Sequence, residues 1–167
     1  MQSVTAFLEQ LQALPLAVFI HKTPWAFTTV EVIHVVAVSL LIGTITIVDL
    51  RLLGIAFARR PFAELSRQVL PFTWAAFVLA VTAGALLFIS RATQYFVNPV
   101  FWIKMALIVI AGINMMIFEF ITVRGVQSWN IDPIPPQPAR LAGAISIASW
   151  ALVIVLGRLI FFTLPTE

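Results

Sequence analysis

The fold class of this chain is decided by residues 69–90, VLPFTWAAFVLAVTAGALLFIS. This stretch carries no charged residue, and it supplies the ~20 apolar residues that an α-helix needs to cross the hydrocarbon core of a bilayer. Working outward from it, three more apolar stretches of similar length occupy residues 27–53, 100–123 and 141–162. They predict an all-α fold, an integral membrane four-helix bundle that forms one domain over residues 1–167.

The composition excludes several classes of protein. Hydrophobic residues make up 61% of the 167 residues and charged residues only 10%, whereas a soluble domain is about half apolar and about a quarter charged. A soluble enzyme is therefore excluded. The net charge is +3, but the ten Lys and Arg are scattered in short connections. The expected partner is thus the lipid bilayer and not nucleic acid.

Missing residue types and motifs narrow the chemistry further. The chain contains no cysteine, which excludes disulfides, thiolate metal sites, iron–sulfur clusters and covalently attached c-type haem. No catalytic triad and no phosphate-binding loop is visible in the sequence. Hydrolase and nucleotide-dependent activities are therefore excluded as well.

The N-terminal segment is predicted to be an amphipathic helix that lies on the membrane surface, over residues 2–20. Its apolar residues recur at helical spacing, with Glu9 on the opposite face. The apolar residues are Val4, Phe7, Leu8, Leu11 and Leu14. Because the helix contains Glu9 and no basic segment precedes it, we do not expect a cleaved secretory signal.

Basic residues set the expected orientation. Six arginines lie at the inner ends of the first and third spans or in the connections that follow them, whereas the opposite side holds Lys22 and Arg91. The six are Arg51, Arg59, Arg60, Arg67, Arg124 and Arg140. Under the positive-inside rule both termini are extracytoplasmic, in a multi-pass protein of the bacterial inner membrane. Interfacial aromatic belts fit the same orientation, with Trp25, Tyr95 and Trp102 at the outer boundary and Trp74 and Trp129 at the inner one.

Ionisable residues also fall inside the outer half of the predicted spans. At a rise of about 1.5 Å per residue, His34 and Arg158 lie about 8–10 Å below the outer boundary, and Glu31 and Lys104 about 5 Å. Arg91 closes the second span nearby. Charges at such depth are costly, so these side chains should point into the bundle. They form either a buried site or a purely structural group in which Glu31 pairs with Lys104 or Arg158.

As a site, this group suits a b-type haem. Such a haem needs an imidazole ligand, an apolar slot and cations near an aqueous boundary for its propionates. His34 is the expected axial ligand, and Arg158, Lys104 and Arg91 are the expected propionate partners. Glu31 would orient a ring or balance charge. The expected function is haem b binding with an electron-transfer or redox-accessory role, beside a membrane redox partner.

The second axial ligand of such a haem is left open. The other histidine, His21, precedes the first span and is expected at the membrane surface. The iron is then five-coordinate, or His21 folds back as a weak second ligand, or a partner chain contributes one.

Two other functions stand beside haem binding. One is a cofactor-free scaffold or accessory subunit of a larger complex, which includes a homo-oligomer. The other is a proton or ion transport component, in which Glu31 and His34 begin a relay that Asp49 and Glu119 continue. Between these two layers the first span offers only serine and threonine. This gap argues against the relay.

Residues nearer the inner boundary are expected to serve packing. Asp49 with Arg51 or Arg124 is interpreted as a helix-end ion pair, and Asn114 as an interhelical hydrogen bond. Trp150 is expected in the core. Small residues expected to permit close helix approach are Gly84, Gly112, Gly143 and Ala144.

Several short motifs together resemble an uncharacterised family of small bacterial four-span membrane proteins. They are EVIH at 31–34, Gly43, DLRLLG at 49–54, LPFTW at 70–74, WIKM at 102–105 and Asn114. The resemblance covers nearly the whole chain and implies four spans without an established activity.

A more distant similarity links the chain to membrane protoporphyrinogen oxidase type and copper-resistance D type proteins. It rests on HVVAVS at 34–39 and Gly43 in the first span, and on Lys104 in the third. The similarity implies haem or porphyrin chemistry near the first-span histidine. Only His34 and Lys104 correspond closely. Asn114 stands near the position of a further histidine in the oxidase type, which argues against the same enzyme activity.

Overall fold

The computed structural model describes residues 2–163, and these contain helices joined by turns and loops, with no strand among them. Four helices are long and apolar enough to cross a membrane, which confirms the predicted all-α four-span fold. They are α3 (Pro24–Leu52), α4 (Phe62–Ser90), α6 (Pro99–Ile117) and α7 (Gln137–Thr163).

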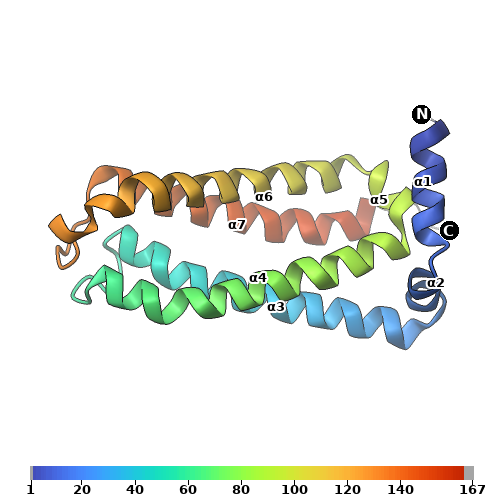
Figure 1. Cartoon of the computed structure of the whole chain (residues 1–167), viewed down its shortest axis with the longest axis horizontal. Coiled ribbons are helices and arrows are strands. Elements are labelled where there is room, and N and C mark those ends of the chain that lie inside the picture. The colour runs from blue at the N-terminus through green and yellow to red at the C-terminus, as the bar shows by residue number, and fades with distance from the viewer. Residues whose placement is uncertain (1, 164–167) are drawn as a thin grey trace.

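The four long helices form two hairpins that lie side by side (Figure 1). Helix α3 packs along α4, α6 packs along α7, and the hairpins meet mainly through α3 and α7. Helices α4 and α6 make no comparable contact within residues 2–163. All four helices contribute to one central hydrophobic cluster of Leu41, Ala76, Ala111, Trp150 and Val153. Trp150 is thus confirmed as a core residue.

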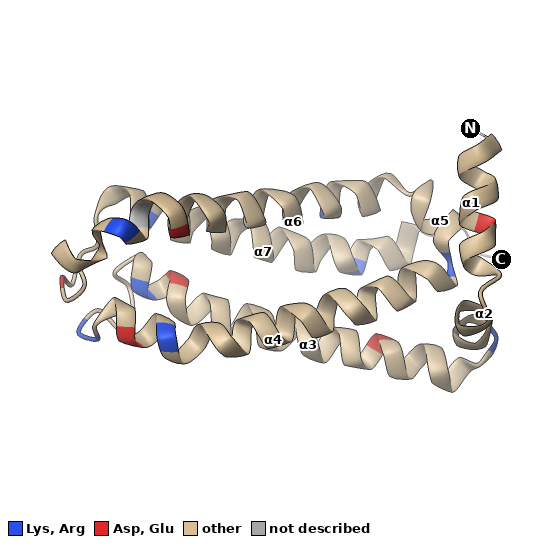
Figure 2. Ribbon diagram, viewed as in Figure 1, with Lys and Arg blue, Asp and Glu red and all other residues tan. Residues whose placement is uncertain are grey.

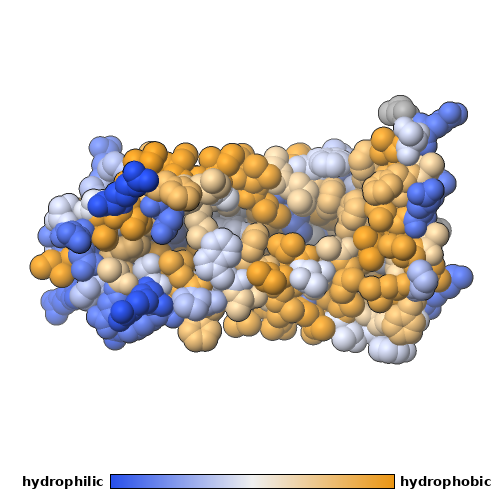
Figure 3. Space-filling view, in the orientation of Figure 1, coloured by the Kyte–Doolittle hydropathy of each residue, from blue (hydrophilic) through white to orange (hydrophobic). Residues whose placement is uncertain are grey.

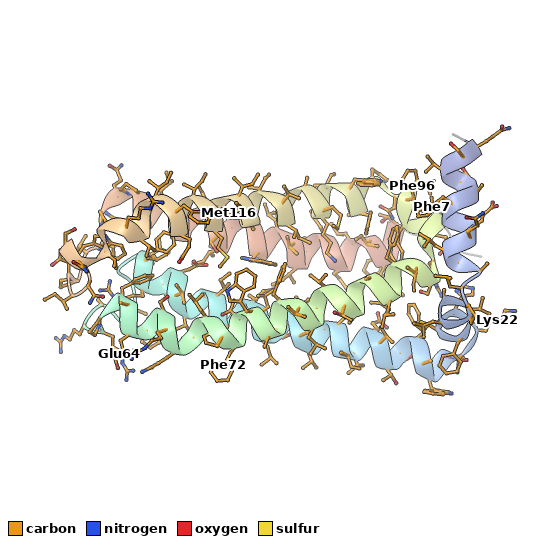
Figure 4. All side chains as sticks on the ribbon, viewed as in Figure 1. Phe7, Lys22, Glu64, Phe72, Phe96 and Met116 are labelled. Carbon is orange, nitrogen blue, oxygen red and sulfur yellow. The ribbon has the colours of Figure 1, made fainter. Side chains whose placement is uncertain are left out.

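Most large apolar side chains of the long helices point outward. At most 28% of any spanning window is buried, and Phe72, which is 69% exposed, points away from the bundle (Figure 4). Apolar surface covers the length of the bundle while hydrophilic residues gather towards its ends (Figure 3). A soluble monomer rarely exposes a continuous apolar surface of this kind, so lipid must cover it.

One end of the bundle, formed by residues 53–61 and 118–136, is here called the arginine end. Arg51 lies at the end of α3 and is fully buried. It donates hydrogen bonds to the backbone carbonyls of Arg60, Asn130 and Asp132, at 2.9–3.1 Å. The expected ion pair of Asp49 with Arg51 or Arg124 is therefore wrong, because loop carbonyls engage the Arg51 guanidinium instead and Arg124 is exposed while Asp49 is buried.

The third span is expected as one helix over residues 100–123, but its α-helix ends at Ile117. After Ile117 the chain continues as a π-helix, η1 (Phe118–Thr122), and a 3₁₀-helix, η2 (Val123–Ser128). Beyond them Trp129 is buried against the Phe62 ring, with ring centroids 5.2 Å apart. Trp129 thus belongs to a core cluster and not to the expected interfacial belt, whereas Trp74 is half exposed.

The opposite end, here called the capped end, is covered by two short helices. The segment predicted as one helix over residues 2–20 consists of α1 (Gln2–Gln12) and α2 (Pro15–Lys22), which are bent by 72° relative to each other. Pro15 explains the break, because proline disfavours helical geometry in the preceding residue, and Leu14 has ψ 137°. Helix α1 runs across the end of the bundle (Figure 1). It leaves Val4 and Phe7 exposed, as a surface helix requires.

A further short helix, α5 (Ala92–Phe96), completes the capped end. It joins α4 to α6 and lies against α1, where Thr93 donates a hydrogen bond of 3.0 Å to Gln12. Asn98 then begins α6, and its side chain accepts hydrogen bonds from the N–H groups of Val100 and Phe101.

Candidate functional site

His34 lies in the contact between α3 and α4, half-buried. Its ring Nδ1 is 2.8 Å from the carbonyl oxygen of Ala80. The ring rests on Gly84, where a Cβ atom would come within 3.0 Å of the imidazole Cε1. Close approach at Gly84 is therefore confirmed. Gly84 is the residue that lets the imidazole enter the seam between the two helices instead of facing lipid.

The hydrogen bond fixes which ring nitrogen of a neutral His34 is available. A backbone carbonyl only accepts hydrogen bonds, so a neutral imidazole in this contact carries its proton on Nδ1. The lone pair of Nε2 is then directed away from Ala80. An Nδ1–H bond to a carbonyl is the usual way in which proteins orient a histidine that ligates a metal through Nε2.

Lys104 approaches the same region from the other hairpin. Its Nζ lies 3.8 Å from the position that a Cβ of Gly157 would occupy, so the lysine reaches across from α6 to α7. His34 is within electrostatic range of both Lys104 and Glu31. The structure thus brings His34 and Lys104 within electrostatic range of each other and His34 within range of Glu31. Glu31 itself is exposed on α3, so the expectation that it points into the bundle is wrong.

Arg91 and Tyr95 complete this group at the capped end. The Arg91 guanidinium lies over the Phe27 ring at 5.0 Å, at the end of α4. The ring of Tyr95 packs against those of Phe88 and Phe101, with centroids 6.2 and 5.7 Å away. Burial raises the pKa of the Tyr95 hydroxyl, Arg91 opposes that shift and Glu31 reinforces it. Both charged groups therefore lie within electrostatic range of Tyr95.

We call Glu31, His34, Arg91, Tyr95 and Lys104 the capped-end cluster. The sequence presented Tyr95 only as an interfacial aromatic residue, because nothing in its local pattern places α5 over the ends of α4 and α6. Half-burial of a lone tyrosine beside charged residues becomes visible only in three dimensions.

The structure does not bring Arg158 or His21 into the cluster. Arg158 is exposed, and its guanidinium lies over the rings of Phe161 and Phe162 at 5.5 and 5.3 Å. These are its own neighbours three and four residues along α7, so Arg158 extends along its helix towards the capped end. His21 is exposed in the last turn of α2.

A second polar group lies nearer the arginine end. Asn114 donates a hydrogen bond of 2.9 Å to the carbonyl of Ala142, which confirms the expected link between α6 and α7. Asp49 is buried beside Ser146, whereas Glu119 is exposed on η1. In Figure 2 the charged residues lie towards both ends of the long helices, with an uncharged stretch between them. The two polar groups are therefore separate.

The glycines expected at close helix contacts divide into two kinds. A Cβ on Gly143 would lie 3.0 Å from the Asp49 carbonyl oxygen, so α7 touches the backbone of α3 there. At Gly112 a Cβ would meet nothing within 4 Å, because this glycine faces outward. The expectation is confirmed for Gly143 and wrong for Gly112 and for Ala144, which is also exposed.

The surroundings limit what the capped-end cluster can hold. Within residues 2–163, no group of three His, Asp or Glu side chains is arranged to bind a metal ion. Two surface hollows, of about 380 and about 300 Å³, lie elsewhere: one at Pro61 and Arg67, the other between Leu40 and Phe72. Between α4 and α6 the surface is hollowed midway along the bundle (Figure 3). A ligand of His34 would therefore be one that a single imidazole can anchor.

Comparison with known proteins places the chain in a family. The model of a family of unknown function, DUF6644, matches residues 16–163. The chain belongs to this family. The match covers α2 to α7, so the capped-end cluster and the buried Asp49 both lie inside the DUF6644 domain. No curated protein and no solved structure matches the chain.

Proposed function

We propose that this membrane protein binds a b-type haem through Nε2 of His34 and serves in electron transfer. The observation that carries the proposal is the hydrogen bond between His34 Nδ1 and the Ala80 carbonyl. It orients the imidazole and leaves Nε2 as the ligating atom. A bound haem would supply one-electron redox chemistry to a membrane partner.

The other cluster residues suit the carboxylates of such a group. Lys104 and Arg91 would carry the positive charges opposite two propionates. The Arg91 Nε is buried without a hydrogen-bond partner, so this guanidinium retains a free donor. Arg158 points away and is not included. Glu31 limits the net positive charge of the cluster.

We place the capped end, and with it both termini, on the outer face of a bacterial inner membrane, since the opposite end is rich in arginine. His21 is exposed on α2, so His34 would be the histidine of this chain that holds the haem, and any second ligand would come from another chain.

A cofactor-free scaffold is the second candidate function, and the same hydrogen bond favours it. The contact from His34 to Ala80 ties α3 to α4 without any ligand. In that case the imidazole fixes the position of one helix on the other, and the positive charges only mark the membrane boundary.

The two functions are separated by the visible spectrum of the purified protein. Protein expressed with ample haem should show a Soret band that is lost in His34→Ala and retained in His21→Ala, the matched control at the exposed histidine. Colourless wild-type protein, or an unchanged spectrum in His34→Ala, would reject haem binding. A scaffold would show no pigment, while His34→Ala would lower its thermal stability.

A further inference from the structure

A carboxyl group lies buried in the contact between the two hairpins, away from the capped-end cluster. Asp49 of α3 is only 4% exposed, and its Oδ2 has no hydrogen-bond partner. Ser146 of α7 lies within hydrogen-bonding range of the carboxyl group. Gly143, one turn earlier on α7, touches the Asp49 backbone. Asp49 therefore sits where α3 and α7 join the hairpins.

The basic residue expected to neutralise Asp49 is engaged elsewhere. Arg51 donates its hydrogen bonds to loop carbonyls beyond the end of α3. The other charged side chains of the helices around this level are exposed, namely Glu64 and Arg67 of α4, Glu119 of η1, Arg124 of η2 and Arg140 of α7. Ser146, the α7 side chain beside the carboxyl group, is uncharged. Asn114, which links α6 to α7, is uncharged as well.

The loss of hydration on burial determines whether such a carboxyl group is protonated or ionised. An ionised carboxylate that is buried without a cation loses its hydration and gains little in return. Protonation removes the charge and supplies an O–H donor, which the serine hydroxyl or a backbone carbonyl can accept.

We propose that Asp49 and Ser146 form a proton-binding site, in which Asp49 is a neutral carboxylic acid in the folded bundle. Release of that proton places a negative charge in the seam between α3 and α7. Because this seam provides most of the contact between the hairpins, deprotonation loosens their docking. The site does not depend on haem binding at His34.

Infrared spectroscopy of the purified protein in lipid tests the protonation state. At neutral pH the wild-type spectrum should contain the carbonyl stretch of a protonated carboxylic acid, and Asp49→Asn should remove it. Ser146→Ala should shift that band, because the hydroxyl is its hydrogen-bonding neighbour. Glu9→Gln, at an exposed position of α1, should leave the band unchanged. A wild-type spectrum without this band would overturn the proposal.

Thermal unfolding at increasing pH tests the consequence for the hairpins. The wild type should lose stability as the pH rises from about 4, where the aspartate of the unfolded chain ionises, up to the pH at which Asp49 ionises in the folded bundle. Asp49→Asn, which resembles the neutral acid in shape, should lack that part of the pH dependence. Glu9→Gln should behave like the wild type. Identical pH profiles for wild type and Asp49→Asn would reject the site. A stability gain with sodium chloride over choline chloride that Asp49→Asn abolishes would also reject it, because sodium would then be the ligand.

Discussion

At the scale of single residues, glycines determine where side chains enter helix contacts. Gly84 accepts the flat imidazole of His34, and Gly143 accepts the backbone of α3. Gly43 and Gly112 have open space around them, so an added methyl group would meet nothing within 4 Å. A glycine is therefore required for helix packing only where another side chain or backbone lies directly opposite it.

Replacing Gly84 with alanine should disturb His34. The new methyl group would press on the imidazole Cε1 from 3.0 Å, so the ring must shift and its bond to Ala80 weaken. We expect a loss of about 1–3 kcal/mol, as for overpacked cores, together with reduced haem content. Thermal unfolding and the Soret absorbance measure both effects. Gly112→Ala is the matched control, and equal losses in the two variants would contradict the prediction.

At the scale of elements, buried polar side chains join segments that are distant in sequence. Arg51 connects the end of α3 to the loop after it and to the loop before α7. Asn98 caps α6 and donates a bond of 2.9 Å to Thr163 at the end of α7. In both cases the side chain satisfies backbone groups that a helix end or a loop leaves without partners.

Removing the Arg51 side chain should destabilise the arginine end. In Arg51→Met the carbonyls of Arg60 and Asp132 lose their donor, whereas the Asn130 carbonyl keeps the N–H of Phe62. Each buried carbonyl left unpaired costs about 1–3 kcal/mol. Partial rehydration of the loops reduces the sum, so we expect a total loss of about 3 kcal/mol. Chemical or thermal unfolding of the purified protein measures it. Arg59→Met, at an exposed position, should change the free energy of unfolding little. A similar loss in that variant would show that removal of a positive charge, and not loss of the buried hydrogen bonds, causes the destabilisation.

At the scale of the whole molecule, the two ends of the bundle differ in character. The arginine end consists of loops and short helices with several exposed arginines, whereas α1, α2 and α5 cover the capped end. Lys22 projects from the capped end (Figure 4). This asymmetry is what orients a helical bundle in a membrane.

The proposed orientation can be measured because the chain has no cysteine of its own. Gln10→Cys on α1 and Gln127→Cys on η2 place single thiols at exposed positions of the two ends. In spheroplasts a membrane-impermeant maleimide should label position 10, and should reach position 127 only after permeabilisation. The reverse pattern would invert the bundle and place the capped-end cluster in the cytoplasmic leaflet.

The sequence by itself determined the four spans, their order and the surface character of the N-terminal segment. Hydrophobicity over ~20 residues is a local property, and in a bilayer only helices satisfy their own backbone hydrogen bonds. It also singled out His34, Glu31 and Lys104, because ionisable residues in apolar stretches are conspicuous in any sequence.

The tertiary structure alone decided the partners of these residues. It directed His34 to Ala80, turned Arg51 to the loops and away from Asp49, left Arg158 exposed, and added Tyr95 to the capped-end cluster. These side-chain contacts depend on how one helix is rotated against the next and on how the chain turns between helices. The rotation follows from packing at positions such as Gly84 and Gly143. Those contacts join residues far apart in the chain, so no local pattern encodes them.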